Sequence, residues 1–406
     1  MASIHNDSVC HVCQARAVTQ LLDFGKQALC NRYLTNSQDD EVCFDFALCQ
    51  CAACGLIQIA RPVPPAELKP RFDWVRHNEQ EDHLDQLVET ICALQGVTVT
   101  SGIGAISLKD DTTLGRFREK GFAKTWRLDL EEDLGVLDSL AGLETIQSRL
   151  SPERGKVIAR RKGLCDVVIV RHIFEHAHDP RRLAGALKQL VTPQGYLVFE
   201  VPDCQPALAS KDFSMPWEEH IMYFTAETFR QSLQMLGFFE VHHQCYPYTN
   251  ENSLVAIVRT QGPAPLVALS ADAIDKQKSL GHTYAAALPL YREKVHLALA
   301  ANRKVGGRTA VFGAGHVSCF WINALSTKDY IEFVIDDDSK KQGLYMPGSR
   351  LPIRSSSALL EANIKLCLLS LAPESESKVL RKNRLLLQRG AQFASIFTSS
   401  KYALSV

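Results

Sequence analysis

The segment DVVIVRHIFEHAHDP, residues 166–180, decides the fold class of this 406-residue chain. Its first five residues form an almost continuous β-branched run, which is typical of a parallel strand that is covered on both faces. Charged and imidazole groups follow directly, at the place where open α/β sheets bind their ligands. The segment therefore predicts a buried strand of an α/β domain with a ligand site at its carboxyl end.

Helices and strands alternate on both sides of this segment. Apolar side chains at helical spacing, helix-starting residues and buried apolar runs between turn residues give the individual elements. Helices are expected at 84–95, 180–191 and 225–238, and strands at 97–100 and 196–201. The stretches 238–245 and 252–260 suit an antiparallel hairpin at the edge of an otherwise parallel sheet.

A second α/β unit is expected in the last quarter of the chain. The glycine and two prolines of 261–268 mark a boundary. A long helical stretch follows at 270–302, and strand-like runs lie at 308–315, 331–338 and 366–372. The pattern predicts a second sheet with helical connections.

The amino-terminal region carries two C-x-x-C pairs, Cys10/Cys13 and Cys51/Cys54. Two such pairs of thiolates can complete the tetrahedron that Zn²⁺ prefers, and a closed four-thiolate site is usually structural. The gap between the pairs requires a loop with structure of its own. The alternative is a set of reduced thiols in a small core, because nothing in the sequence suggests export and disulfides.

Charge and hydropathy exclude several classes of partner. Lys+Arg and Asp+Glu both total 45, so no net field favours nucleic acid. The basic cluster at 154–162 is short and is more typical of a solvated face. The chain begins MASIHNDSVC, without a basic region before an apolar stretch, and no apolar segment suggests a membrane span. We expect a cytoplasmic protein.

A glycine turn is the first candidate for a cofactor contact. Ser101-Gly102-Ile103-Gly104 follows a predicted strand, and glycines there would let the backbone approach a ligand closely. Asp129 stands at the end of the next probable strand, where a carboxylate can accept hydrogen bonds from a ribose diol. The alternative for Asp129 is a surface aspartate at a strand end.

Two further segments concentrate titratable groups. His172, His176 and His178 follow the buried strand and indicate a polar active-site edge; a metal held by His172 and His176 would need a third ligand. In PWEEHIMYFT (216–225), the position of Glu219 beside His220 suggests a base whose proton affinity is raised by a carboxylate. The alternative is a hydrogen-bonded loop that anchors the following helix.

The order of these parts resembles the S-adenosylmethionine-dependent sugar C-methyltransferases, which act on nucleotide-linked keto-deoxysugars. The cysteine module with LLDFGKQALCNRYL (21–34), FEHAHDP (174–180), the loop WEEH (217–220) and VFGAGHVSCFWIN (311–323) carry the resemblance. It implies S-adenosylmethionine and structural Zn²⁺ as cofactors, a nucleotide-sugar substrate, and a monomer or homodimer.

The resemblance also implies an α/β architecture in four parts. These are a zinc-binding module at 1–70, a class I methyltransferase domain with a Rossmann-like fold at 71–262, a helical connector at 263–305, and a second Rossmann-like domain at 306–406 that packs over the substrate site.

The resemblance assigns roles to particular residues. His220 would remove the proton beside a ketone, Glu219 would orient its ring, and His176 would hydrogen-bond the ketone or enolate oxygen. Trp217 stands where the family has tyrosine, and an indole cannot serve as acid or base. The substrate-binding set is Trp74, Tyr223 and His316, and the cofactor-binding set is Gly102, Gly104, Asp129 and Arg171.

Two departures keep other hypotheses open. The loop TSGIGAISLKDDTTL (100–114) lacks the family's acidic residue followed by G-x-G-x-G, so the chain could be a methyltransferase-like binding or assembly protein that has lost the cofactor. Gly313-x-Gly315-x-x-Ser318 with Asp336 partly matches a dinucleotide fingerprint, so a NAD-dependent sugar oxidoreductase is a third hypothesis. Its third glycine is missing.

Overall fold

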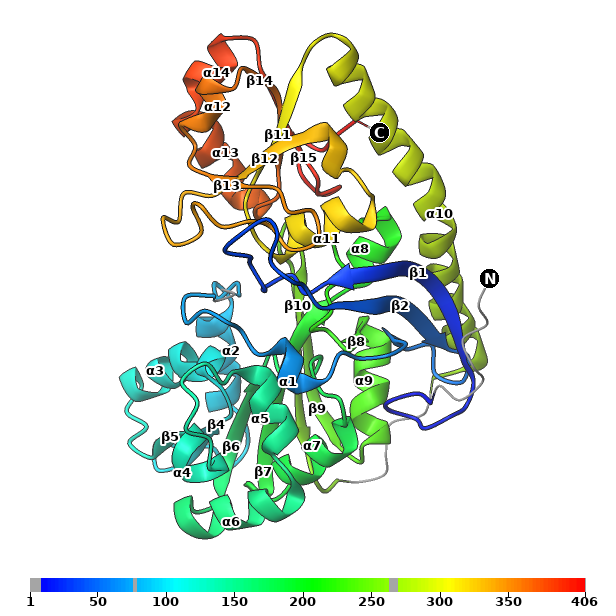
Figure 1. Ribbon diagram of the computed structural model, residues 1–406. Helices are drawn as coiled ribbons and strands as arrows, with labels where there is room; N and C mark the ends of the chain where they lie inside the picture. Colours follow the sequence, from blue (N-terminus) through cyan, green and yellow to red (C-terminus); the bar gives the residue numbers. More distant parts are fainter. Residues whose placement is uncertain (1–8, 76–78, 263–268, 406) are drawn as a thin grey trace.

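The computed structural model describes residues 9–75, 79–262 and 269–405, which form three sheets joined by helices (Figure 1). The amino-terminal sheet is antiparallel and has the order β1-β2-β3-β8. Its strands are β1 (Val18–Ala28), β2 (Cys43–Cys51), β3 (Ile57–Ile59) and β8 (Met222–Tyr223). The last strand therefore comes from the middle of the chain, directly after the predicted base.

The central sheet has the order β5-β4-β6-β7-β10-β9. Its strands are β4 (Ile103–Ala105), β5 (Thr125–Arg127), β6 (Cys165–Arg171), β7 (Val191–Asp203), β9 (Phe239–Tyr246) and β10 (Asn252–Arg259). The first four strands are parallel, and β10 is antiparallel to both β7 and β9. The predicted buried strand and the predicted edge hairpin are both confirmed.

Helices cover both faces of this sheet, as the continuous apolar run of β6 requires. One face packs against α2 (Leu84–Cys92) and α3 (Asp111–Glu119). The other packs against α4 (Leu130–Leu134), α5 (Leu143–Arg149), α6 (Pro152–Lys162), α7 (Pro180–Leu187) and α9 (Ala226–Met235). Short helices α1 (Pro65–Leu68) and α8 (Gln205–Ser210) lie outside these layers. The α/β class is confirmed.

The carboxyl-terminal sheet is wholly parallel, with the order β13-β12-β11-β14-β15. Its strands are β11 (Arg308–Phe312), β12 (Ile331–Ile335), β13 (Ile353–Arg354), β14 (Ile364–Leu369) and β15 (Gln392–Ser395). Its helices are α11 (His316–Ala324), α12 (Ala358–Glu361), α13 (Pro373–Lys382) and α14 (Arg384–Gln388). The 3₁₀ turns η1 (Leu108–Asp110) and η2 (Lys328–Tyr330) complete the elements.

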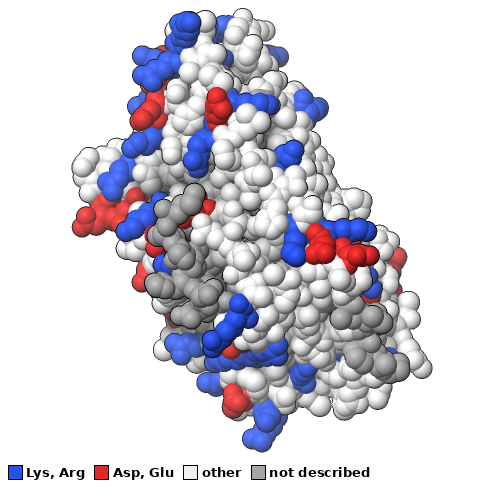
Figure 2. Space-filling view, turned by 90° about the vertical axis from the view of Figure 1, so that its right-hand side faces the viewer, with Lys and Arg blue, Asp and Glu red and all other residues white. Residues whose placement is uncertain are grey.

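The long helix α10 (Ala271–Lys304) runs along one side of the molecule and contacts both β1 and β11 (Figure 1). Its buried Gln277 accepts a hydrogen bond from Nε2 of Gln50 and lies 3.0 Å from the Thr225 hydroxyl, so it joins the amino-terminal sheet to the start of α9. Figure 2 shows the face on which α10 lies, where acidic and basic side chains are interspersed around a largely uncharged middle. Among the described residues, no helix is long and apolar enough to cross a membrane.

One predicted strand was wrong. Residues 97–100 contain a turn, and the strand begins only at Ile103. Gly102 therefore precedes the strand and Gly104 lies inside it. A Cβ at Gly104 would lie 2.8 Å from Sγ of Cys165 and 3.0 Å from the ring of Trp126, so this glycine makes room for neighbouring side chains.

Candidate active site

The four predicted zinc ligands lie together. Sγ of Cys10 is 3.7 Å from Sγ of Cys54, and Sγ of Cys13 is 3.6 Å from Sγ of Cys51. All four sulfur atoms lie within 4.8 Å of one another. With Zn–S bonds of roughly 2.3 Å, neighbouring sulfurs of a tetrahedral site stand about 3.8 Å apart, so these cysteines fit a structural Zn²⁺.

A cleft with a volume of about 590 Å³ opens where the three sheets meet. Its lining comes from the amino-terminal module, the central domain and the carboxyl-terminal domain. The lining residues that matter here are Tyr33, Trp74, Trp217, His220, His316 and Lys341. The structure thus brings Trp74, Trp217, His220 and His316, which the sequence nominated separately, to one cavity.

Aromatic rings form the walls of this cleft. The rings of Trp217 and His316 are stacked, with centroids 4.3 Å apart, across the boundary between the central and carboxyl-terminal domains. The ring centroids of Trp74 and Tyr33 are 5.5 Å apart, and the Tyr33 hydroxyl donates to the carbonyl of Ala314 at 2.7 Å. Such surfaces suit a planar ring or the apolar face of a sugar.

Tyr223 has a different place from the one predicted. It is buried, and its hydroxyl accepts from the backbone N–H of Trp217 at 3.0 Å and donates to the Trp217 carbonyl at 2.9 Å. These bonds fix the loop that carries His220. Tyr223 thus holds the loop in place, and its contact with substrate stays a prediction.

His220 faces the cleft from this loop. Burial holds the pKa of its imidazole well below the usual value, and the nearby His176 lowers it further. At neutral pH the ring is therefore in its neutral, proton-accepting form. The sequence suggested a proton affinity raised by Glu219; in the structure burial and a second imidazole outweigh any such effect.

The carboxylates beside His220 contact the amino-terminal module. Glu219 accepts a hydrogen bond from Nδ2 of Asn31 at 2.8 Å, and Glu218 accepts one from the backbone N–H of Cys30 at 2.5 Å. Burial raises the pKa of Glu219 to about 8, and the neighbouring Glu144 adds to the effect. Through its bond with Asn31, Glu219 ties the loop to the module.

His176 lies directly behind His220, with ring centroids 4.9 Å apart. Its Nδ1 is 2.7 Å from Oε1 of Glu144 on α5, and both side chains are buried. Burial alone would lower the pKa of His176, but Glu144 raises it above its usual value. Sequence reasoning missed Glu144, because one acid on a short helix looks like a surface residue.

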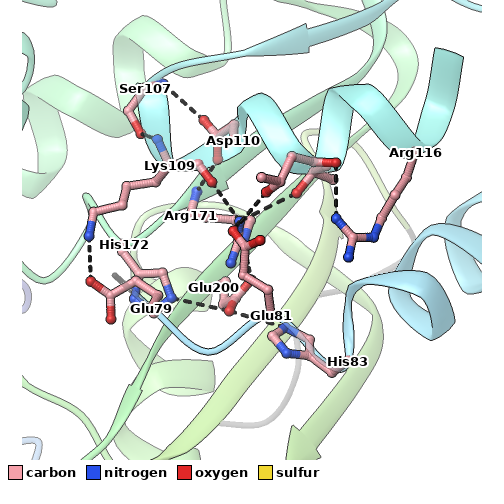
Figure 3. Close-up of polar contacts among 12 residues, drawn as sticks. Glu79, Glu81, His83, Ser107, Lys109, Asp110, Arg116, Arg171, His172 and Glu200 are labelled. Carbon is pink, nitrogen blue, oxygen red and sulfur yellow. Dashed lines mark hydrogen bonds and ion pairs between the residues drawn. The ribbon is translucent and has the colours of Figure 1, made fainter. Parts of the chain in front are cut away.

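At the carboxyl ends of β4 and β6 a polar network fills the edge of the central sheet (Figure 3). The Asp110 carboxylate accepts from the backbone N–H groups of Ile106 at 3.0 Å and Ser107 at 2.9 Å. The guanidinium of Arg171 donates to Glu200 at 2.5 Å and to the carbonyl of Lys109 at 2.6 Å. This edge is where α/β folds usually bind ligands.

Histidines complete this network. His172, at φ 47°, has Nε2 3.1 Å from Oε1 of Glu200, and Nε2 of His83 lies at the same distance from that oxygen. Burial alone would lower the pKa of His172, but Glu79, Glu175 and Glu200 raise it to about 10. Lys109 in turn pairs with Glu79 at 2.5 Å.

The residues predicted to hold the cofactor all have protein contacts at the edge of the central sheet. Gly102 donates its N–H to the Asp166 carboxylate at 2.9 Å, and Gly104 lies inside β4. Arg171 is fully buried in the network with Glu200. Asp129 caps α4 by accepting from the N–H of Glu132 at 2.8 Å. These contacts give Gly102, Gly104 and Arg171 structural roles, and their part in cofactor binding stays a prediction.

Comparisons with known proteins agree with the order of the three parts. Residues 10–68 match a family described as "Putative zinc binding domain", 110–244 one described as "Methyltransferase domain", and 271–397 one described as "C-methyltransferase C-terminal domain". The C-methyltransferase NovU of Streptomyces niveus is 24% identical over 372 residues, which cover 85% of each chain.

Two solved structures are similar to the central part. One is 1,6-didemethyltoxoflavin-N1-methyltransferase of Burkholderia thailandensis, with 16% identity over 44% of this chain and 79% of that one, at a TM-score of 0.28. The other is a SAM-dependent methyltransferase of Anabaena variabilis, with 16% identity over 46% of this chain and 86% of that one, at a TM-score of 0.32.

The three family matches follow one another along a single chain. The relative NovU, whose match spans 85% of each chain, is itself a C-methyltransferase. Together these matches show the three-part C-methyltransferase architecture, with its zinc-binding, methyltransferase and carboxyl-terminal domains, and the chain is an S-adenosylmethionine-dependent C-methyltransferase.

Proposed function

We propose that this C-methyltransferase acts on a nucleotide-linked keto-deoxysugar, and that His220 removes the proton from the sugar carbon beside the ketone. The observation that carries the proposal is the cleft, which a neutral imidazole faces between aromatic walls. A cavity of this kind, with a few convergent polar groups, suits a small organic substrate.

The chemistry requires a base at this place. Carbon becomes a nucleophile only when a neighbouring carbonyl acidifies its C–H bond and a base takes the proton, which leaves an enolate. The neutral form of His220 can accept that proton at neutral pH. S-adenosylmethionine, when bound, supplies an electrophilic methyl group. Trp217 has no titratable proton and supports the ring of His316 instead.

The carboxyl-terminal domain offers a place for the nucleotide diphosphate. Helix α11 begins at His316, and Gly315, His316 and Val317 at its start line the cleft, where a helix amino terminus favours an anion. Lys341 lines the same region and donates to the Ala314 carbonyl at 2.8 Å. The aromatic pair Trp217 and His316 would then stack against the nucleobase or the sugar.

Deuterium exchange tests the base without the methyl donor. The protein is incubated in D₂O with a panel of TDP-, UDP-, GDP- and CDP-linked 4-keto-6-deoxyhexoses, and mass spectrometry follows the sugar. We expect deuterium at the carbon beside the ketone of one member. His220→Asn should abolish the exchange, whereas His282→Asn, at an exposed position of α10, should retain it.

Methyl transfer completes the test. Labelled S-adenosylmethionine should place its methyl group on the same carbon that exchanges. If no member of the panel exchanges or is methylated, the keto-sugar assignment is wrong. If His220→Asn exchanges as fast as the unchanged protein, the base lies elsewhere.

A further inference from the structure

A buried carboxylate and imidazole form a pair behind the cleft. Glu144 is 4% exposed and His176 is 3% exposed, and Oε1 of the first lies 2.7 Å from Nδ1 of the second. The other oxygen of Glu144 accepts from Nε2 of Gln147 at 3.1 Å. A short contact between a carboxyl oxygen and an imidazole nitrogen favours a charge-assisted pair, and Glu144 raises the pKa of His176.

The imidazole of this pair lies against the ring of His220. The rings of His176 and His220 meet edge to face, at an interplanar angle of 87°. One nitrogen of each ring and one oxygen of Glu175 lie within 4.8 Å of one another. His220 lines the cleft, whereas His176 is buried next to it. The pair can therefore affect the substrate only by changing the state of His220.

We propose that Glu144 is a positioning residue that keeps His176 protonated, and that this imidazolium holds His220 in its neutral, proton-accepting form. The proposal rests on the function proposed above, since it explains how the base is kept ready. It differs from the role that the family resemblance gives to His176, which is direct contact with the ketone oxygen.

Other charged groups act on the same two rings. Glu175 from the loop after β6 and Glu219 from the loop before β8 also face His176 and raise its pKa, while His178 lies 3.7 Å from Glu144. Around His220, the imidazoles His316 and His172 lower its pKa and Glu79 raises it. Glu144 also raises the pKa of Glu219 and lies close to His178, so His176→Gln is needed beside Glu144→Gln to assign the effect on His220 to His176.

The sign of the expected change follows from this geometry. Without the Glu144 charge, burial favours neutral His176, and the repulsion that disfavours protonated His220 disappears. His220 should then take up its proton at higher pH. Two unit charges about 5 Å apart at an effective dielectric constant of about 20 would shift a pKa by roughly two units, so a shift of about one to two units is expected.

Histidine-ring NMR measures these charge states without substrate or cofactor. The full chain is labelled at histidine Cε1 and titrated, with signals assigned from His176→Gln and His220→Asn. In the unchanged protein His176 should be charged at pH 7. In Glu144→Gln it should be neutral, and the midpoint of His220 should rise. Glu119→Gln, at an exposed site on α3, should leave both unchanged.

A second variant keeps the test valid if Glu144→Gln does not fold. His176→Gln removes the imidazolium itself and should raise the His220 midpoint in the same direction. Neutral His176 in the unchanged protein at pH 7, or an unchanged His220 midpoint in a folded variant, would overturn the inference.

The pH profile of kcat/KM gives the catalytic readout. The acid limb of Glu144→Gln should move up by the same one to two units seen for His220 by NMR, which loss of structure alone would not produce. An acid limb that stays in place would overturn the inference. If the NMR shifts occur but no keto sugar is exchanged or methylated, the role of Glu144 stands and the substrate proposal fails.

Discussion

Glu200→Gln should strongly destabilise the central domain. Glu200 is fully buried on β7, and it accepts from Arg171 at 2.5 Å and from the Ser253 hydroxyl at 2.8 Å. The variant keeps the shape but removes the charge, so the guanidinium of Arg171, also fully buried, loses its main partner. Breaking a buried ion pair from one side typically costs about 3–5 kcal/mol.

The lower end of this range is the better expectation, because Glu81 remains 3.5 Å from Arg171 and Asp110 accepts its backbone N–H. Unfolding in urea, followed by circular dichroism and tryptophan fluorescence, measures the loss of free energy. The matched control is Glu240→Gln, which removes the charge facing Arg230 in a partly exposed pair on the same domain. That change should cost about 0.2–1 kcal/mol.

Lowering the pH should reduce the difference in the free energy of unfolding between Glu200→Gln and the unchanged protein. Burial alone would raise the pKa of Glu200, but Arg171, His172 and His83 hold it well below its usual value. A lowered folded-state pKa gives stability that is present above the unfolded value near 4.5 and is lost as the pH falls through the folded value. The reasoning is refuted if Glu200→Gln costs no more at pH 7 than Glu240→Gln.

Three further predictions concern the metal, the network and the cleft. The purified chain should hold one Zn²⁺, and Cys51→Ser should release it and lower the melting temperature, whereas Cys43→Ser, at an exposed cysteine, should do neither; loss of metal with an unchanged melting temperature would contradict a structural site. The folded protein raises the pKa of His172 from 6.5 to about 10, so His172 adds to the free energy of unfolding below pH 6.5, and this addition is lost as the pH rises toward 10. Asparagine tolerates the positive φ of this position, so His172→Asn should remove that part of the loss of stability at alkaline pH. An unchanged dependence of the free energy of unfolding on alkaline pH would contradict this prediction. Lys341→Gln should raise KM for the nucleotide sugar about tenfold, as expected for one lost charge-assisted contact, while the exposed Lys382→Gln should not, and equal KM values would remove Lys341 from the site.

The sequence predicted the strands that are long and apolar, and it failed where a strand is short. The β6 run and the 252–260 run carry enough β-branched residues to be recognised as strands. The spacing of the four cysteines alone was enough to predict that they lie together as a zinc site. Strand β4 has only three residues, one of them glycine, so VTVT at 97–100 looked like the better strand. Because the strand was expected too early in the chain, the glycine turn was expected after the strand, whereas Gly102 precedes it.

The site was predictable in its parts but not in its contacts. WEEH stood out because it gathers titratable groups, yet the partners of its carboxylates, Cys30 and Asn31, lie nearly 190 residues earlier. Glu144 lies 32 residues before His176 and has no local pattern that marks it. Such pairings arise only when distant segments pack, and burial then sets the charge states that no spacing shows.

The pairing of β8 with β3 joins the cysteine module to the loop that carries His220. Met222 and Tyr223 extend that sheet two residues after His220, and Glu218 and Glu219 are tethered to the same module from the other side of the imidazole. A chimaera that takes its cysteine module from a relative would therefore need matching residues on both sides of these contacts. Removal of the zinc by a chelator should displace the His220 imidazole at a temperature at which the central sheet is still folded.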